Sequence, residues 1–245
     1  MFSKPSVQAV YRIIQITLKS CRERPVSTAY RNVLYGINVD YERKFIYQGK
    51  EYTPQSFAAS LQLNTDDYVC LTSFSHHPFY TQFILEVPDN WIWSSSYNLP
   101  VTEMMSIIDN ALDNGYTVLW ASDVSEAGYT RKGIAVVPEA DPQIRSAELA
   151  KMAESPCIEK TITQEMRQEA FDNKQTTDDH AMHIFGIAKD QNGKKFYMVK
   201  NSYGTSSGYQ GIWYASEAYV RYKTTNIMVH KNTIPATIKQ KINLK

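Results

Sequence analysis

This chain has few cysteines, no long apolar run and almost no net charge, and each shortage excludes a class of protein. Its three cysteines are an odd number, far apart and without metal-ligand spacing, which argues against a disulfide framework. No segment reaches the roughly 20 apolar residues that span a bilayer, and the start lacks a signal-peptide pattern. Because 26 Lys and Arg face 25 Asp and Glu, no global field favours nucleic acid or an anionic membrane. A cytoplasmic protein that binds neither is the expectation.

What the chain does have is the composition of a globular protein. It contains 245 residues, 43% of them hydrophobic and 12% aromatic, which is enough for one large domain or two modest ones. No internal repeat or glycine-rich phosphate loop is present, and no cofactor is expected.

Hydrophobic periodicity and turn residues predict a mixed α+β fold. Helices are predicted over 6–21, 54–61, 102–114 and 163–171, and strands over 45–47, 50–52, 68–71, 117–121, 182–188, 195–199, 211–214 and 226–230. The last four strands suggest a small antiparallel sheet or barrel-like half, with a hairpin turning at Asn192-Gly193. The segment 138–156 is predicted to be a loop or a poorly ordered insertion, and the C-terminal Lys239, Lys241 and Lys245 to form a solvated tail.

The predicted hairpin has a consequence for two polar residues that are 21 positions apart. Folding 182–199 about its turn brings His180 and Asn201 to the same end of the hairpin. An asparagine oxygen can then accept from one imidazole nitrogen while the other faces a thiol. This arrangement is typical of two members of a thiol-protease triad.

The sequence around these residues resembles the papain superfamily of cysteine peptidases, specifically the bleomycin hydrolase and aminopeptidase C family. The motifs are Asp-His-Ala-Met at 179–182, Lys-Asn-Ser-Tyr-Gly at 200–204 and Gly-Ile-Trp at 211–213. Upstream runs at 50–57, 67–71, 115–118 and 123–124 also resemble the family in order. The resemblance covers about 35–245, whereas the helical segment 1–34 is poorly matched. It implies a papain-like fold, incomplete in this chain, in which a β lobe carries the histidine and asparagine.

The resemblance also implies roles and partners. His180 corresponds to the proton-exchanging base, Asn201 to its orienter, and Tyr203 to a residue, usually tryptophan, that shields their hydrogen bond. The implied reaction is hydrolysis of a peptide substrate at its N-terminus, in a homo-oligomer that is a hexameric ring in the family. A C-terminal arm, to which the family's aminopeptidase preference is attributed, is conceivable for the chain end.

The nucleophile is the missing member of the triad. Gln15 precedes Cys21 by six residues, as the family's glutamine precedes its cysteine, but Arg22 replaces the expected tryptophan. Periodicity also places Cys21 at the end of a helix, where the dipole disfavours a thiolate. Cys70 lies in an apolar strand and Cys157 has no matched base nearby.

Three interpretations therefore stay open. The first is a truncated aminopeptidase whose nucleophile lobe lies upstream, so that this chain alone is inactive. The second is a non-catalytic binding or assembly module derived from the family. The third is a self-contained enzyme that uses Cys21.

Several other residues carry a weaker functional signal. His183 lies on the opposite strand face to His180, so a structural role is favoured. Adjacent His76 and His77 lack a further ligand, which argues against a metal site. Trp91 and Trp93, with Tyr97, fit a substrate cleft, although core or oligomer-interface packing is more usual. Asp123 fits either a ligand-facing loop or an Asx turn.

Overall fold

The computed structural model describes residues 44–88 and 90–244, which fall into two compact units divided at Asp66/Asp67. Cys21, the predicted helix 6–21 and the predicted boundary at 34/35 lie outside the described residues. Within the described part of the chain, no helix is long and apolar enough to cross a membrane.

The described part of the first unit is a hairpin followed by a short helix, as predicted. Strands β1 (Phe45–Tyr47) and β2 (Lys50–Tyr52) pair antiparallel. Both turn residues, Gln48 and Gly49, have positive φ, as a two-residue type I′ turn requires. Helix α3 (Pro54–Ser60) starts with a capping box between Thr53 and Ser56.

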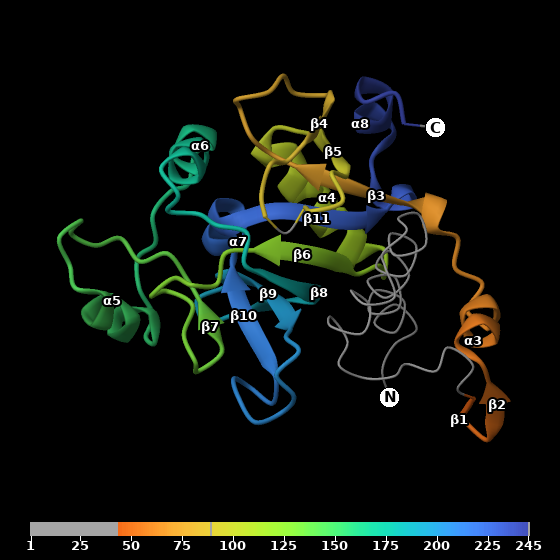
Figure 1. Cartoon of the computed structure of the whole chain (residues 1–245). Helices are drawn as coiled ribbons and strands as arrows, with labels where there is room; N and C mark the ends of the chain where they lie inside the picture. Colours follow the sequence, from red (N-terminus) through yellow and green to blue (C-terminus); the bar gives the residue numbers. More distant parts are fainter. Residues whose placement is uncertain (1–43, 89, 245) are drawn as a thin grey trace, which may run out of the picture. The chain divides into compact units, whose positions relative to one another are not determined.

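The second unit is built on one nine-stranded sheet (Figure 1). Its order is β4 (Gln82–Ile84), β5 (Ser95–Asn98), β3 (Tyr68–Thr72), β11 (Thr224–His230), β6 (Val118–Ser122), β8 (His180–Lys189), β9 (Lys195–Lys200), β10 (Ile212–Ser216) and β7 (Ile134–Ala135). The pairs β3/β5 and β7/β10 are parallel and the others antiparallel. The predicted antiparallel strands are confirmed, but they belong to a larger, mixed sheet.

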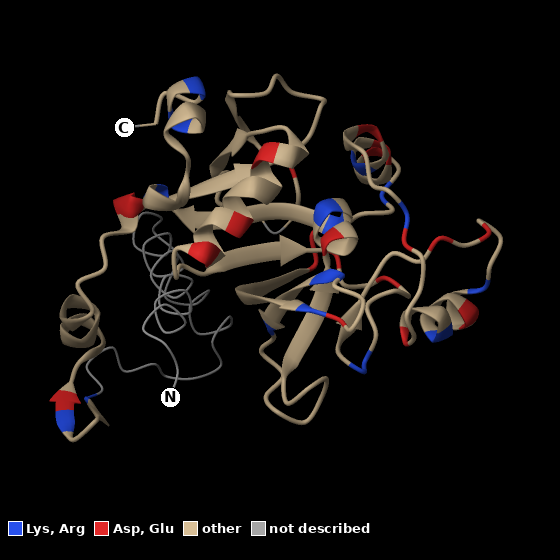
Figure 2. Cartoon of the chain, turned by 180° about the vertical axis from the view of Figure 1, so that it is seen from behind, with Lys and Arg blue, Asp and Glu red and all other residues tan. Residues whose placement is uncertain are grey.

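Five α-helices accompany this sheet: α4 (Val101–Asp113), α5 (Ser146–Ala153), α6 (Gln164–Asp172), α7 (Glu217–Lys223) and α8 (Ala236–Lys241). Short 3₁₀ turns occupy Thr65–Asp67 and Lys231–Thr233. The apolar face of α4 joins Trp120, Ile184 and Val199 in the main core. Several elements carry both acidic and basic residues; on α7, Glu217 lies in the first turn and Arg221 and Lys223 in the last (Figure 2).

Three local predictions were wrong. Pro100, not Thr102, is the N-cap of α4, and the first helical amide, Val101, donates to Gln164 at 2.8 Å. The segment predicted as a loop contains α5, whose alanine-rich sequence has high helix propensity. The predicted tail forms α8, because Ile238 and Ile242 occupy one helical face and are buried.

The position of α8 also bears on the suggested C-terminal arm. Helix α8 follows the end of β11 at His230, whereas His180 is in register, through Ser122 of β6, with the start of β11 at Thr224. The chain end, as far as Leu244, therefore packs at the opposite end of the sheet from His180.

Candidate active site

The hairpin of β8 and β9 brings His180 and Asn201 into direct contact. The His180 Nε2 lies 2.9 Å from the Asn201 Oδ1, which is a good hydrogen-bond distance. Because an amide oxygen only accepts, Nε2 must carry the proton, and Nδ1 then has a lone pair. The predicted proximity of His180 and Asn201 is confirmed.

The asparagine side chain is held on both of its polar atoms. Its Nδ2 donates to the Tyr129 hydroxyl at 2.9 Å, and its Oδ1 accepts from the Ser202 backbone amide at 2.7 Å. Asn201 is only 3% exposed, so these bonds are made away from bulk water. The amide orientation that presents oxygen to His180 thus satisfies every polar atom of the side chain.

Aromatic rings surround this pair. Tyr203 stacks on His180 with ring centroids 5.5 Å apart and an interplanar angle of 17°. Tyr129 stacks on Trp213, which is buried and donates from Nε1 to the Thr130 carbonyl at 3.0 Å. Tyr203 is 56% exposed, so it covers one side of the imidazole while its own outer face meets solvent.

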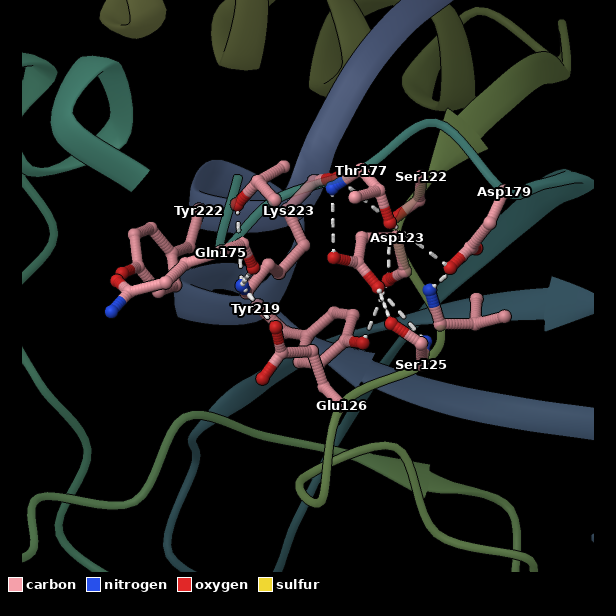
Figure 3. A network of polar contacts seen from close by, with 12 residues as sticks. Ser122, Asp123, Ser125, Glu126, Gln175, Thr177, Asp179, Tyr219, Tyr222 and Lys223 are labelled. Carbon is pink, nitrogen blue, oxygen red and sulfur yellow. Dashed lines mark hydrogen bonds and ion pairs between the residues drawn. The ribbon is translucent and has the colours of Figure 1, made fainter. Parts of the chain in front are cut away.

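The loop before His180 is anchored by a buried carboxylate, Asp123, just beyond the end of β6 (Figure 3). One Asp123 oxygen accepts from the Ser125 amide at 2.8 Å and hydroxyl at 2.7 Å, and the other accepts from the Thr177 amide at 2.9 Å. The Ser125 contact confirms the Asx-turn role considered for Asp123. The Thr177 contact ties the β6 loop to the residues that precede His180.

A second carboxylate, Asp179, and a buried lysine complete this network. Asp179 accepts from the Val124 amide at 2.9 Å. Lys223, 3% exposed, pairs with Glu126 and donates to the Gln175 carbonyl at 2.6 Å. Three chain segments therefore meet at residues 175–179, which precede His180: the β6 loop, the loop before β8 and the end of α7 (Figure 3).

The two aspartates differ in their electrostatics. Burial alone would raise the pKa of Asp123, but hydrogen bonds from Thr177 and Ser125, with the charge of Lys223, lower it below its usual value. Burial and the neighbouring Asp123 charge raise the pKa of Asp179, despite the Val124 hydrogen bond. Of the two aspartates, Asp123 is thus the one whose ionised form is stabilised.

Neither described cysteine lies near the imidazole. Cys70 is on β3, three strand spacings or about 14 Å from β8. The Cys157 carbonyl accepts from Lys194 at the turn end of the hairpin, and that end is roughly 25–30 Å along β8 from His180. Burial and Glu159 also raise the pKa of the Cys157 thiol, which disfavours a thiolate.

The other residues singled out in the sequence lie elsewhere. His183 is buried, and burial lowers its pKa to about 4, in keeping with a structural role. His76 contacts Gln168 and His77 stacks on Phe83. No metal-binding cluster occurs among residues 44–88 and 90–244.

The aromatic residues of 91–97 divide into two groups. Trp91 is 51% and Trp93 60% exposed, so core packing is wrong for both, while a substrate cleft and an oligomer interface stay predictions. Tyr97 packs against the main core.

Sequence reasoning missed Tyr129 and Lys223. Tyr129 lies in a loop with no periodic pattern, and only its pairing with Asn201, 72 positions away, shows its importance. Lys223 was missed because helix α7 was not predicted, although Ser216 is an N-cap residue of a common type, accepting from Tyr219.

The sheet and its histidine–asparagine pair define a papain-like cysteine peptidase fold. The crystal structure of PepW from Lactobacillus rhamnosis superposes with a TM-score of 0.65 at 21% identity, covering 97% of this chain and 57% of that one. Aminopeptidase C of Streptococcus thermophilus is 25% identical over 194 residues, 76% of this chain and 41% of that protein.

The model of the Peptidase C1-like family matches residues 3–245, and the chain belongs to that family. Together with the aminopeptidase C match, this confirms the resemblance to the aminopeptidase C and bleomycin hydrolase group. The chain spans less than two thirds of the length of these relatives.

Proposed function

We propose that this chain supplies the histidine–asparagine half of a thiol aminopeptidase site. The observation that carries the proposal is the 2.9 Å bond from His180 Nε2 to Asn201 Oδ1, because it leaves Nδ1 to exchange a proton with a thiol. The stacked Tyr203 supports it, since a ring over the imidazole shields that bond from water on one side.

The proposed reaction is peptide-bond hydrolysis near the substrate N-terminus. A thiolate attacks the carbonyl carbon, and His180, as imidazolium, protonates the leaving amine while the C–N bond breaks. Water, deprotonated by His180, then hydrolyses the thioester and regenerates the thiol. Asn201 keeps the imidazole oriented and stabilises its charged form.

The nucleophile in this proposal comes from outside the described residues. Cys70 and Cys157 lie far from His180, so the 245-residue chain is expected to be inactive unless Cys21 acts as the nucleophile. An epoxide probe separates these cases: labelling that disappears in Cys21→Ser would support the self-contained enzyme, and no labelling of the wild-type chain would exclude it.

The test of the proposal compares this chain with one extended into any in-frame sequence upstream of Met1. If that sequence encodes a Gln-x5-Cys-Trp segment, the longer chain should hydrolyse aminoacyl-coumarin substrates. His180→Ala should then reduce kcat/KM by at least about 10³-fold, and Asn201→Ala should have a smaller effect. Full activity of His180→Ala would overturn the proposal. His183→Ala is the control, because it removes a nearby histidine and leaves His180 and Asn201 in place.

A second candidate is a non-catalytic binding or assembly module. The distance of both described thiols from the imidazole favours it for the chain alone. A closed reading frame upstream, with no probe labelling, would decide for this function.

A further inference from the structure

The loop between β6 and β7 anchors both members of the imidazole–amide pair, through two different residues. Asp123 accepts from Thr177, three residues before His180, and Tyr129 accepts from Asn201. Register explains this convergence, since Ser122 at the end of β6 pairs with His180 at the start of β8. The loop therefore leaves β6 at the same end of the strands as His180 and Asn201.

We propose that Tyr129 is a positioning residue of this site. Its hydroxyl holds the Asn201 amide with oxygen toward the imidazole, and thereby selects the His180 tautomer with a proton on Nε2 and a lone pair on Nδ1. The inference rests on the proposed function, in which Nδ1 exchanges a proton with a thiol.

The hydrogen-bond directions around the hydroxyl support this role. The Tyr129 O–H points to the Met182 sulfur at 3.2 Å, so an oxygen lone pair is available for the Asn201 NH₂ group at 2.9 Å. Burial raises the pKa of Tyr129 above its usual value, so the hydroxyl keeps its proton at neutral pH.

The Tyr129 ring is itself fixed in place. It stacks on Trp213 at 5.8 Å with an interplanar angle of 7°, and its backbone bridges to Ala135. A hydroxyl on a ring so held is a well-placed acceptor for an amide that is shielded from solvent.

Removing the hydroxyl leaves the buried NH₂ group of Asn201 without an acceptor. Rotation of the amide by 180° would give NH₂ the Nε2 atom as an acceptor and favour the opposite imidazole tautomer, but it would turn NH₂ toward the Ser202 amide and leave Oδ1 facing the phenyl ring. Tyr129→Phe is therefore expected to shift the tautomer ratio of His180 by about fivefold, the size of one net hydrogen bond.

The experiment is ¹⁵N NMR of the His180 side chain in the full chain, comparing wild type, Tyr129→Phe and Tyr197→Phe. Tyr197 is also buried and also loses one hydroxyl bond, to Asp109 at 2.7 Å, but does not touch the pair. A shift of about this size away from the Nε2–H tautomer, in Tyr129→Phe alone, supports the inference. An unchanged ratio in folded Tyr129→Phe, or the same shift in Tyr197→Phe, overturns it.

A measurement on the wild-type chain keeps the test decisive if Tyr129→Phe does not fold. The Asn201 NH₂ protons should show a nuclear Overhauser contact to the Tyr129 ring and exchange slowly with water; absence of both overturns the inference. None of these readouts needs catalysis. If His180→Ala leaves the extended enzyme active, the proposed function fails independently of the tautomer result.

Discussion

The two members of the imidazole–amide pair are supported by different kinds of chemistry. On the His180 side, the preceding loop is held by ionised groups, chiefly Asp123 with Lys223 nearby. On the Asn201 side, the support is a neutral aromatic cluster of Tyr129, Trp213 and Tyr203. The charged side is therefore expected to respond to acid, and the aromatic side to loss of packing.

The largest effect is expected on the aromatic side. Trp213→Ala should lower the free energy of unfolding by about 4 kcal/mol, because a buried indole leaves a cavity and Tyr129 loses its stacking partner. Urea denaturation measures this change. Trp91→Ala is the matched control, since Trp91 is 51% exposed and should change stability by less than about 0.5 kcal/mol. Equal losses of stability in Trp213→Ala and Trp91→Ala would contradict the packing argument.

On the charged side, Asp123→Ala should cost about 3 kcal/mol, because the Thr177 and Ser125 donors lose a buried acceptor. The same denaturation experiment applies. The Asp141 side chain is exposed and accepts from the Gln143 amide at 2.8 Å in a similar Asx turn, so Asp141→Ala should cost below about 0.5 kcal/mol. A small loss for Asp123→Ala would show that the loop does not depend on its carboxylate.

The pH dependence separates the two sides. Since the folded-state pKa of Asp123 is lowered, its ionisation stabilises the fold above its unfolded pKa near about 4, and this contribution is lost as pH falls through the lower folded value. The stability difference between wild type and Asp123→Asn should thus shrink between about pH 4 and pH 2. The difference for Tyr129→Phe should stay constant there, because a phenol does not ionise in acid. If the stability differences of the two variants changed with pH in the same way, the assignment of the acid response to Asp123 would be refuted.

The smallest effect concerns Asp179, whose pKa is raised. Its ionisation opposes folding, so Asp179→Asn should be slightly more stable at pH 7, by less than about 1 kcal/mol at this exposed position. The gain should vanish below about pH 4, where both states are protonated. Thermal unfolding at pH 7 and pH 3.5 tests both statements, with Asp141→Asn as control. A loss of stability at pH 7 would mean that the Val124 hydrogen bond outweighs the repulsion.

The elements that sequence reasoning found have strong local signals. Asn192-Gly193 with flanking alternating strands predicted β8 and β9, and Thr163 capping α6 was read directly from its residue type. Helices α7 and α8 are only 7 and 6 residues long, too short for a periodic pattern, and neither opens with the Thr-Pro pair that revealed the equally short α3. The placement of β3 beside β11 joins residues 156 to 162 positions apart, which no local pattern specifies.

For this protein, the sequence by itself determined the family, the hairpin and therefore the pairing of His180 with Asn201, because a tight turn fixes register over a short range. Only the tertiary structure decided what holds that pair. Tyr129 and Asp123 reach it through the antiparallel register of β6 and β8, a contact between distant segments that depends on how strands assemble into a sheet. The structure likewise showed that the two described thiols lie far from the imidazole, since strand order and hairpin direction set those distances.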